Sequence, residues 1–272
     1  MRFTSLLALA ASPVFVTLVL GQTYTLCNPM EKTCPKDPAL GGNYEHIFGG
    51  EAPSFTATGS GEMILYKDDG AHFRVEKTND APTIASNFYI MYGKVEAVLL
   101  AAPGAGIVSS LVLLSDVLDE IDWEWIGSDV GQAQSNYFGK GNTQTYDRGA
   151  FHPVNHQKFH DYGIEWTPQS VKWSIDGTVV RTLTPDQVKG DFYPQTPMQI
   201  KIGSWSGGDP GNSPGVIKWA QGPTDYTKGP FDMVVKSVKI QDYSTGTYYY
   251  YSDHSGSAAS IRSEGGEIMN GP

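Results

Sequence analysis

Three acidic residues alternate with bulky apolar residues in the segment 118–126, at Glu120, Asp122 and Glu124. Successive side chains of an extended strand point to opposite faces, so these three carboxylates share one face. Neighbouring carboxylates on that face are about 6.6 Å apart at their Cα atoms. The opposite face receives Asp119, Ile121, Trp123 and Trp125. The pattern predicts one strand of a sheet with a packed back and a wet, acidic front.

Three like charges in one row disfavour ionisation, so we expect at least one of these carboxyl groups to keep its proton near neutral pH. An ionised and a protonated carboxyl on either side of one bond are what retaining glycoside cleavage requires. Spacing alone leaves two other interpretations open. The row is also compatible with a solvated strand face. It also suits a calcium site, although the glycine of a known calcium-binding loop is missing.

Two further segments combine aromatic and polar groups in the way that a sugar site needs. The segment 135–148 carries Tyr137 among amides, glycines and basic residues. The segment is also compatible with an ordinary polar loop whose aromatic rings pack against the protein core. The segment 198–205 alternates so that Lys201 and Trp205 share its polar side, which is unusual unless that side is a cleft. We predict Trp205 and Trp219 as stacking residues, with the alternative that one of them is core.

Three histidines, His152, His156 and His160, follow one another at intervals of four residues. On a helix this spacing would align them as metal ligands. Pro153 biases the residue before it away from helical conformation, and His160 opens a predicted strand. We therefore favour loop and strand-edge positions for these histidines, and we expect neither a metal nor another cofactor.

Glycine, proline and aromatic residues are frequent among the 272 residues, and long amphipathic periods are few. Such a composition favours strands and turns over helices. Asp176-Gly177 between two apolar runs predicts a two-residue hairpin turn. Strands are expected at 62–66, 71–76, 83–91, 92–101, 107–115, 118–126, 159–166, 170–176, 178–183, 198–205 and 231–243. This succession predicts an all-β fold, a sandwich or jelly roll.

The ends of the chain differ from its middle. Residues 1–21 carry one early arginine and then an apolar run, which predicts a secretory signal peptide, with a retained anchor as the alternative. Residues 22–250 are expected to form the folded domain. Residues 251–272 are mostly Ser, Gly, Ala and charged groups, which is typical of a linker or tail. No hydrophobic stretch follows that would specify a lipid anchor.

The compartment and the charge limit the partners. Cys27 and Cys34 are the two cysteines, and in a secreted chain they are expected to form one disulfide. The formal net charge of −10 argues against nucleic acid and anionic membranes as partners, whereas a neutral polymer would not be repelled. We expect no membrane span in the mature chain.

The segment 119–124, Asp-Glu-Ile-Asp-Trp-Glu, resembles the catalytic strand of glycoside hydrolase family 16. Further segments resemble the fungal Crh-type cell-wall transglycosylases of that family, at 92–96, 102–110, 136–142, 163–168 and 205–211. The resemblance runs from the cysteine pair to about residue 243. It implies a β-jelly roll of two packed sheets with the substrate cleft across the concave face.

Carried over to this sequence, the resemblance makes Glu120 the nucleophile and Glu124 the general acid/base, with Asp122 assisting the nucleophile. It also implies donor-side residues, which are Tyr137, Lys201, Trp205 and Trp219.

The function that the resemblance implies is cleavage of a chitin donor and its transfer to β-glucan, which cross-links the two polysaccharides. The implied location is the cell wall after secretion, with a GPI anchor in a full-length form, and we expect a monomer. Two alternatives stay open. One is a secreted endo-glycanase, a chitinase or β-glucanase, on the same fold. The other is a lectin-like module that binds glycans without chemistry.

Overall fold

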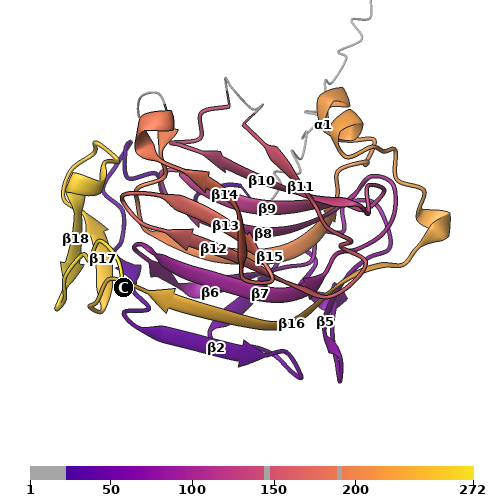
Figure 1. Cartoon of the computed structure of the whole chain (residues 1–272), viewed down its shortest axis with the longest axis horizontal. Coiled ribbons are helices and arrows are strands. Elements are labelled where there is room, and N and C mark those ends of the chain that lie inside the picture. Colours follow the sequence, from indigo (N-terminus) through magenta and orange to yellow (C-terminus); the bar gives the residue numbers. More distant parts are fainter. Residues whose placement is uncertain (1–22, 144–147, 189–191) are drawn as a thin grey trace, which may run out of the picture.

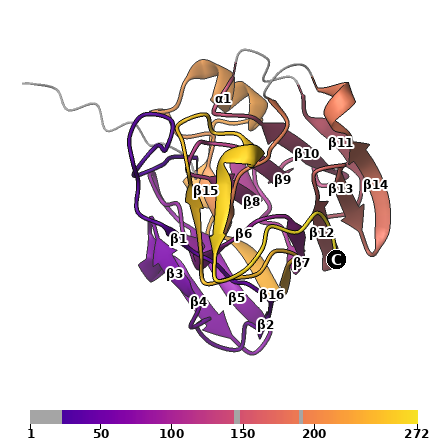
Figure 2. The ribbon, with the colours of Figure 1, turned by 90° about the vertical axis from the view of Figure 1, so that its left-hand side faces the viewer.

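The computed structural model describes residues 23–143, 148–188 and 192–272 of the chain. The fold consists almost entirely of antiparallel strands, arranged as two large sheets that pack face to face (Figure 1). In Figure 2 the sheets lie as two layers, with β8, β9 and β10 in one and β7, β12 and β13 in the other. The predicted all-β jelly-roll sandwich is confirmed. The predicted signal peptide, residues 1–21, lies outside the described residues.

The sheet that carries the acidic strand has seven strands in the order β11-β10-β9-β8-β15-β6-β3. Their bounds are β3 Phe55–Thr58, β6 Thr83–Ile90, β8 Ile107–Ser115, β9 Glu120–Ile126, β10 Gln132–Phe138, β11 Ala150–Pro153 and β15 Met198–Ser206. Strand β9 pairs with β8 on one side and with β10 on the other. The acidic strand therefore lies inside the sheet, where neighbours on both sides fix its position.

The second sheet has eight strands, in the order β14-β13-β12-β7-β16-β5-β4 with β2 paired to β16. Their bounds are β2 Asn43–Ile47, β4 Ile64–Lys67, β5 Gly70–Val75, β7 Gly93–Leu100, β12 His160–Trp166, β13 Val171–Ile175, β14 Thr178–Leu183 and β16 Phe231–Asp242. Asp176 and Gly177 join β13 to β14, both with positive φ, at 49° and 75°. The predicted hairpin turn is confirmed, because the favoured two-residue turns require such angles.

Large aromatic residues fill the space between the sheets and tie the acidic strand to its support. Trp123 and Trp125 of β9 are fully buried, with ring centroids 6.3 Å apart. The Trp123 indole N–H donates to the carbonyl of Gly163 at 3.1 Å, and the Trp173 indole N–H donates to the carbonyl of Asp122 at 3.0 Å. These two bonds cross from sheet to sheet in opposite directions. The backbone that carries the acids is therefore held by hydrogen bonds to the eight-stranded sheet.

A small third sheet, β1-β17-β18, covers one end of the sandwich (Figures 1 and 2). Its bounds are β1 Asp37–Pro38, β17 Tyr248–Tyr251 and β18 Ile261–Glu264. The chain after residue 250 is therefore not a linker, which corrects the expectation from its composition. Ile261 is buried in the core, and the serine hydroxyls bond locally, as in the donation from Ser252 to the Ser260 carbonyl at 2.8 Å. Backbone pairing and buried side chains outweigh the polar composition here.

Helical structure is confined to short segments. The one α-helix among the described residues is α1, Pro214–Trp219. Ser213 caps it by accepting a bond from the Val216 amide, and Pro214 occupies its first turn. Sequence analysis missed this helix, although serine followed by proline is a helix-start signal. The 3₁₀ turns are η1 Gly61–Met63, η2 Pro185–Gln187, η4 Tyr226–Lys228 and η5 Ala258–Ser260.

Candidate active site

Strand register brings the acidic residues and a lysine to one face of the seven-stranded sheet. Asp122 lies opposite Val112 of β8 and Asn136 of β10, and Val112 in turn lies opposite Lys201 of β15. Directly opposed residues point to the same side of a sheet. We call this side, which carries Glu120, Asp122, Glu124 and Lys201, the acidic face. Because Ile121, Trp123 and Trp125 are buried on the other side, the predicted division of β9 into two faces is confirmed.

The carboxyl groups of the acidic face are withdrawn from water. Glu120 is 8% exposed and Asp122 is 1% exposed, while Glu124 is partly buried. A solvated strand face would leave these carboxyl groups exposed to water, so the structure contradicts that interpretation. Burial is the largest cause that raises their pKa values, because a low-dielectric surrounding disfavours charge. The pKa of Glu120 rises to about 7 and that of Glu124 to about 8.

The middle acid is the one most strongly driven to its neutral form. Burial raises the pKa of Asp122 far above its ordinary value, and repulsion from Glu124 and Glu120 adds to it. A carboxyl with two acidic neighbours and almost no water is expected to hold its proton at neutral pH. Asp122 can then donate a hydrogen bond rather than carry a charge.

The two glutamates lie in different surroundings. The charge of Lys201 and a hydrogen bond from the Thr23 hydroxyl both lower the pKa of Glu120 against the effect of burial. For Glu124, the charge of Glu120 adds to burial and raises the pKa further. Lys201 itself is 6% exposed, and burial lowers its pKa to about 8. The charge of Lys201 favours an ionised Glu120 with or without the Thr23 contact, so Glu120 is the better place for a negative charge and Glu124 is the better place for a proton.

The two predicted stacking tryptophans meet beside Glu124. Their ring centroids are 6.2 Å apart with an interplanar angle of 24°, and both rings are partly exposed, so neither is a core residue. Trp219 is the last residue of α1, and its indole N–H donates to the side-chain oxygen of Gln134 at 3.1 Å. Gln134 lies directly opposite Glu124. The pair provides a flat apolar surface next to the acids, the kind of surface on which a pyranose ring stacks.

Tyr137 is not brought to this face. It lies opposite Ile121, is 6% exposed, and packs in the core. The guanidinium groups of Arg148 and Arg181 lie over its ring at 5.4 and 5.5 Å from the centroid. We do not carry Tyr137 forward as a substrate-binding residue. The residues of β10 that do face the acids are its neighbours Gln134 and Asn136, which sequence analysis missed because it predicted no strand over this segment.

Asp119, the remaining acid of the motif, has a structural position. Its carboxylate is fully buried and accepts hydrogen bonds from the Lys140 amide at 3.0 Å, the Gln195 amide at 2.9 Å and the Thr196 hydroxyl at 2.7 Å. These bonds join two loops to the start of β9. They place Asp119 on the side away from the acidic face.

Replacing Asp119 by alanine is expected to lower the free energy of unfolding by about 2–4 kcal/mol, because three buried donors lose their acceptor. Urea denaturation followed by tryptophan fluorescence measures this. Asp119→Asn serves as the matched control and should lose less, because it keeps one acceptor oxygen. An unchanged midpoint for Asp119→Ala would contradict the structural role.

The histidines have separate partners. His152 bonds the Ser135 hydroxyl at 2.8 Å, His156 bonds the Asp129 carbonyl at 2.9 Å, and His160 pairs with Asp176 at 2.7 Å. Within the described ranges, no three His, Cys, Asp or Glu side chains are grouped as metal ligands. The predicted Cys27–Cys34 disulfide is confirmed. No helix in the described part of the chain is long and apolar enough to cross a membrane.

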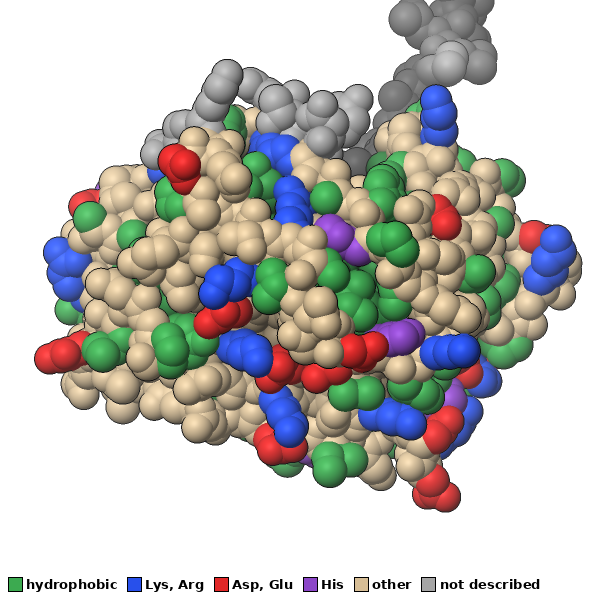
Figure 3. All heavy atoms as spheres, viewed as in Figure 1, with side chains coloured by type: hydrophobic (Ala, Val, Ile, Leu, Met, Phe, Trp, Pro, Cys, Tyr) green, Lys and Arg blue, Asp and Glu red, His purple; other side chains and the backbone are tan. Residues whose placement is uncertain are grey.

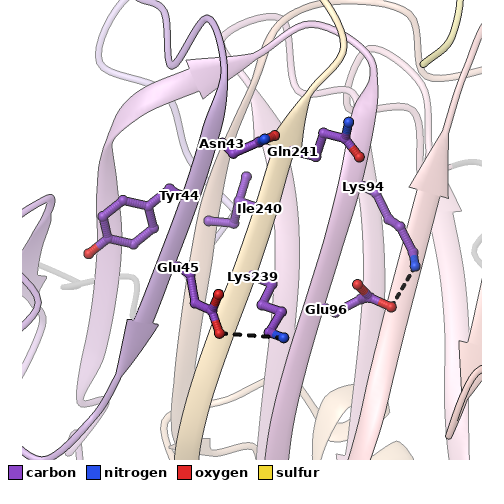
Figure 4. Close-up of a pocket in the computed structure, with 8 residues that line it drawn as sticks. All are labelled: Asn43, Tyr44, Glu45, Lys94, Glu96, Lys239, Ile240 and Gln241. Atoms are coloured by element: carbon purple, nitrogen blue, oxygen red, sulfur yellow. Dashed lines mark hydrogen bonds and ion pairs between the residues drawn. The ribbon is translucent and has the colours of Figure 1, made fainter.

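A hollow of about 440 Å³ lies on the opposite side of the molecule, on the outer face of the eight-stranded sheet (Figure 4). Its charged groups pair with one another, Lys94 with Glu96 at 2.5 Å and Lys239 with Glu45 at 3.4 Å. Figure 3 shows acidic and basic side chains gathered in a band over this sheet. The lysines here neutralise the acids, so the hollow offers no counterpart to the carboxyl groups of the acidic face.

Known proteins match this chain over most of its length. A model of glycosyl hydrolases family 16 matches residues 51–221. A Crh-like protein of Arthroderma benhamiae is 52% identical over 264 residues, which are 96% of this chain and 56% of that protein. Crh-like protein 4 of Aspergillus fumigatus is 53% identical over 254 residues, 92% of this chain and again 56% of the relative. The chain thus spans about half the length of these two relatives.

Solved structures agree with the fold. A Crh5 transglycosylase in complex with NAG has a TM-score of 0.85 at 51% identity, covering 88% of this chain and all of that chain. A β-glucanase of Bacillus licheniformis has a TM-score of 0.58 at 23% identity, covering 74% of this chain and 98% of that one. The second likeness shows the shared fold alone.

Proposed function

The chain belongs to glycosyl hydrolase family 16, and we propose that it is a retaining transglycosylase that cleaves a chitin donor and passes it to β-glucan in the fungal cell wall. The names of its relatives support this proposal, since they are Crh-like proteins and a Crh5 transglycosylase solved with NAG. The observation that carries it in this chain is the unequal environment of Glu120 and Glu124. Secretion to the wall is part of the same proposal.

In the first half of the proposed reaction, ionised Glu120 attacks the anomeric carbon of the donor. The bond from that carbon to the leaving oxygen breaks, and Glu124 gives its proton to that oxygen. We propose that protonated Asp122, whose buried carboxyl oxygens have no hydrogen-bond partner in the structure, donates to Glu120 once the donor is bound and steadies its orientation. The product is a sugar covalently held on Glu120, with Glu124 now ionised.

In the second half, Glu124 accepts the proton of an incoming hydroxyl, whose oxygen displaces Glu120 from the anomeric carbon. The hydroxyl comes from an acceptor glucan in transfer and from water in hydrolysis. Both outcomes share the covalent intermediate, so the choice depends on how well the acceptor is held and water excluded. Trp205 and Trp219 are the residues that we propose to hold a sugar ring beside the acids.

Mass spectrometry of the products tests the proposal. We expect a short chitooligosaccharide incubated with a labelled laminari-oligosaccharide to give hybrid masses, in which the label is joined to N-acetylglucosamine units. Shortened chitooligosaccharides alone would indicate a hydrolase instead. An unchanged mixture would favour a glycan-binding module. The Glu120→Gln variant is the control, because any hybrid that it forms at the wild-type rate does not arise from this site.

A further inference from the structure

The first described residues of the chain lie on the acidic face. The Thr23 hydroxyl donates to both carboxylate oxygens of Glu120, at 3.3 Å to Oε1 and 3.2 Å to Oε2. The ring of the next residue, Tyr24, covers Lys201, whose Nζ lies 4.5 Å from the ring centroid. Two consecutive residues thus engage Glu120, the proposed nucleophile, and Lys201, which shares the acidic face with it.

The position of the Thr23 hydroxyl conflicts with attack by Glu120. A donor nearly equidistant from both carboxylate oxygens lies in front of the group, between its two oxygens. An attacking oxygen needs the anomeric carbon at about 3–3.5 Å along this approach. The hydroxyl therefore has to leave before the proposed reaction begins.

A disulfide-closed loop next to these residues keeps them near the site. Cys27, bonded to Cys34, follows three residues after Tyr24, and its backbone exchanges hydrogen bonds with the Thr25 hydroxyl at 3.0 and 3.2 Å. The disulfide loop is held in turn by the His254 ring, which bonds the Pro29 carbonyl at 2.6 Å. A tethered group acts at a high effective concentration, so even weak contacts on the acidic face are populated.

The segment itself is lightly packed. Tyr24 is 41% exposed and Leu26 is 89% exposed, so little apolar surface holds them in place. Few buried contacts mean a low free energy of local opening. The disulfide-closed loop is firm and the free part is weakly bound, which is the arrangement of a displaceable strap.

We propose that residues 23–26 form a strap that lies over Glu120 and Lys201 and competes with the sugar donor for the acidic face. The donor binds only the fraction of molecules whose strap is open, and its apparent affinity is reduced by that fraction. Once the donor is bound, the strap is displaced and takes no part in the chemical step. The inference rests on the proposed function in one respect, the role of Glu120 as nucleophile.

Steady-state kinetics of the full chain test the strap. In the double variant Thr23→Val and Tyr24→Ala, we expect the KM for the N-acetylglucosamine tetramer to fall about five- to tenfold at saturating acceptor, with kcat unchanged. Thr23→Ser keeps the hydroxyl and should retain the wild-type KM. Tyr248→Ala is the matched aromatic control, since Tyr248 is 42% exposed on β17 and belongs to the small third sheet. An unchanged KM in the double variant would overturn the strap, and so would a raised KM, which would make Tyr24 part of the sugar site.

A second measurement does not depend on activity. With 3-fluorotyrosine at position 24, the fluorine signal should move when Lys201→Met removes the charge beneath the ring, and again when the tetramer displaces the strap from the wild-type chain. A wild-type chain inactive on every chitooligosaccharide would defeat the proposed function. The strap would then be tested only by the change in the fluorine signal on Lys201→Met. A fluorine signal that stays the same in Lys201→Met would overturn the strap.

Discussion

Replacement of Glu120 by glutamine is expected to reduce both transfer and hydrolysis by about 10⁴-fold or more, because an amide cannot form or release the glycosyl intermediate. Rates of product formation from a chitooligosaccharide donor, measured by mass spectrometry, provide the test. The fold should persist, since glutamine has the shape of glutamate and Trp123, on the opposite face of β9, keeps its bond to Gly163. A melting temperature near that of the wild type would establish this.

The stereochemistry of rescue separates the nucleophile from any other essential residue. In Glu120→Ala, added azide should enter from the face that the carboxylate occupied and give the α-glycosyl azide, inverted relative to a β-linked donor. Glu96→Gln is the matched control, because Glu96 is an acid of the outer face of the eight-stranded sheet and pairs with Lys94. It should leave the rate unchanged. Ordinary turnover by Glu120→Gln would refute the assignment.

The acidic strand could be predicted because its information is local. A strict alternation of acids with Ile121, Trp123 and Trp125 fixes both the strand and its two faces whatever its neighbours are. The same holds for β15, where alternation alone set Lys201 and Trp205 on one side. Such patterns need no knowledge of the partner strand, and the structure agrees with them.

Tyr137 illustrates where local information ends. The segment Gln132–Phe138 is rich in amides and poor in β-branched residues, so nothing in it indicates a strand. Its register is fixed by pairing with β9, and a shift of one residue exchanges the two faces. The family resemblance pointed to the correct strand but to the wrong side of it. Gln134 and Asn136 became visible only once the register was known.

The ends of the chain depend on contacts that are distant in sequence. Thr23 and Glu120 are 97 positions apart, and no pattern near either residue indicates that they meet. Residues 251–272 have the composition of a linker, yet β18 completes a sheet with β17 and β1. Composition describes what a segment does in isolation, whereas these segments are ordered by surfaces that the rest of the chain provides.

Replacement of Glu124 by glutamine is expected to slow cleavage of natural donors by about 10²–10⁴-fold, the range for loss of a general acid. The loss should nearly vanish for the first step with a donor whose leaving group is a phenol of low pKa, because such a group departs without a proton. A burst of released phenol followed by slow turnover would show that the covalent intermediate forms normally and that its breakdown, which needs a general base, has become slow. Equal losses with both kinds of donor would contradict the role.

The pH profile provides the sharper test of Glu124. Burial and the charge of Glu120 raise the pKa of Glu124 to about 8, so this side chain holds its proton below pH 8. The enzyme should therefore lose activity as the pH rises through that value. Glu120 must be ionised, so activity also falls as the pH drops through its pKa, raised to about 7. The wild-type profile of kcat/KM is therefore expected to be a narrow bell. In Glu124→Gln the basic limb should disappear and the acidic limb should remain. A basic limb that persists would assign it to Lys201, whose pKa burial lowers to about 8, and Lys201→Met would then remove it.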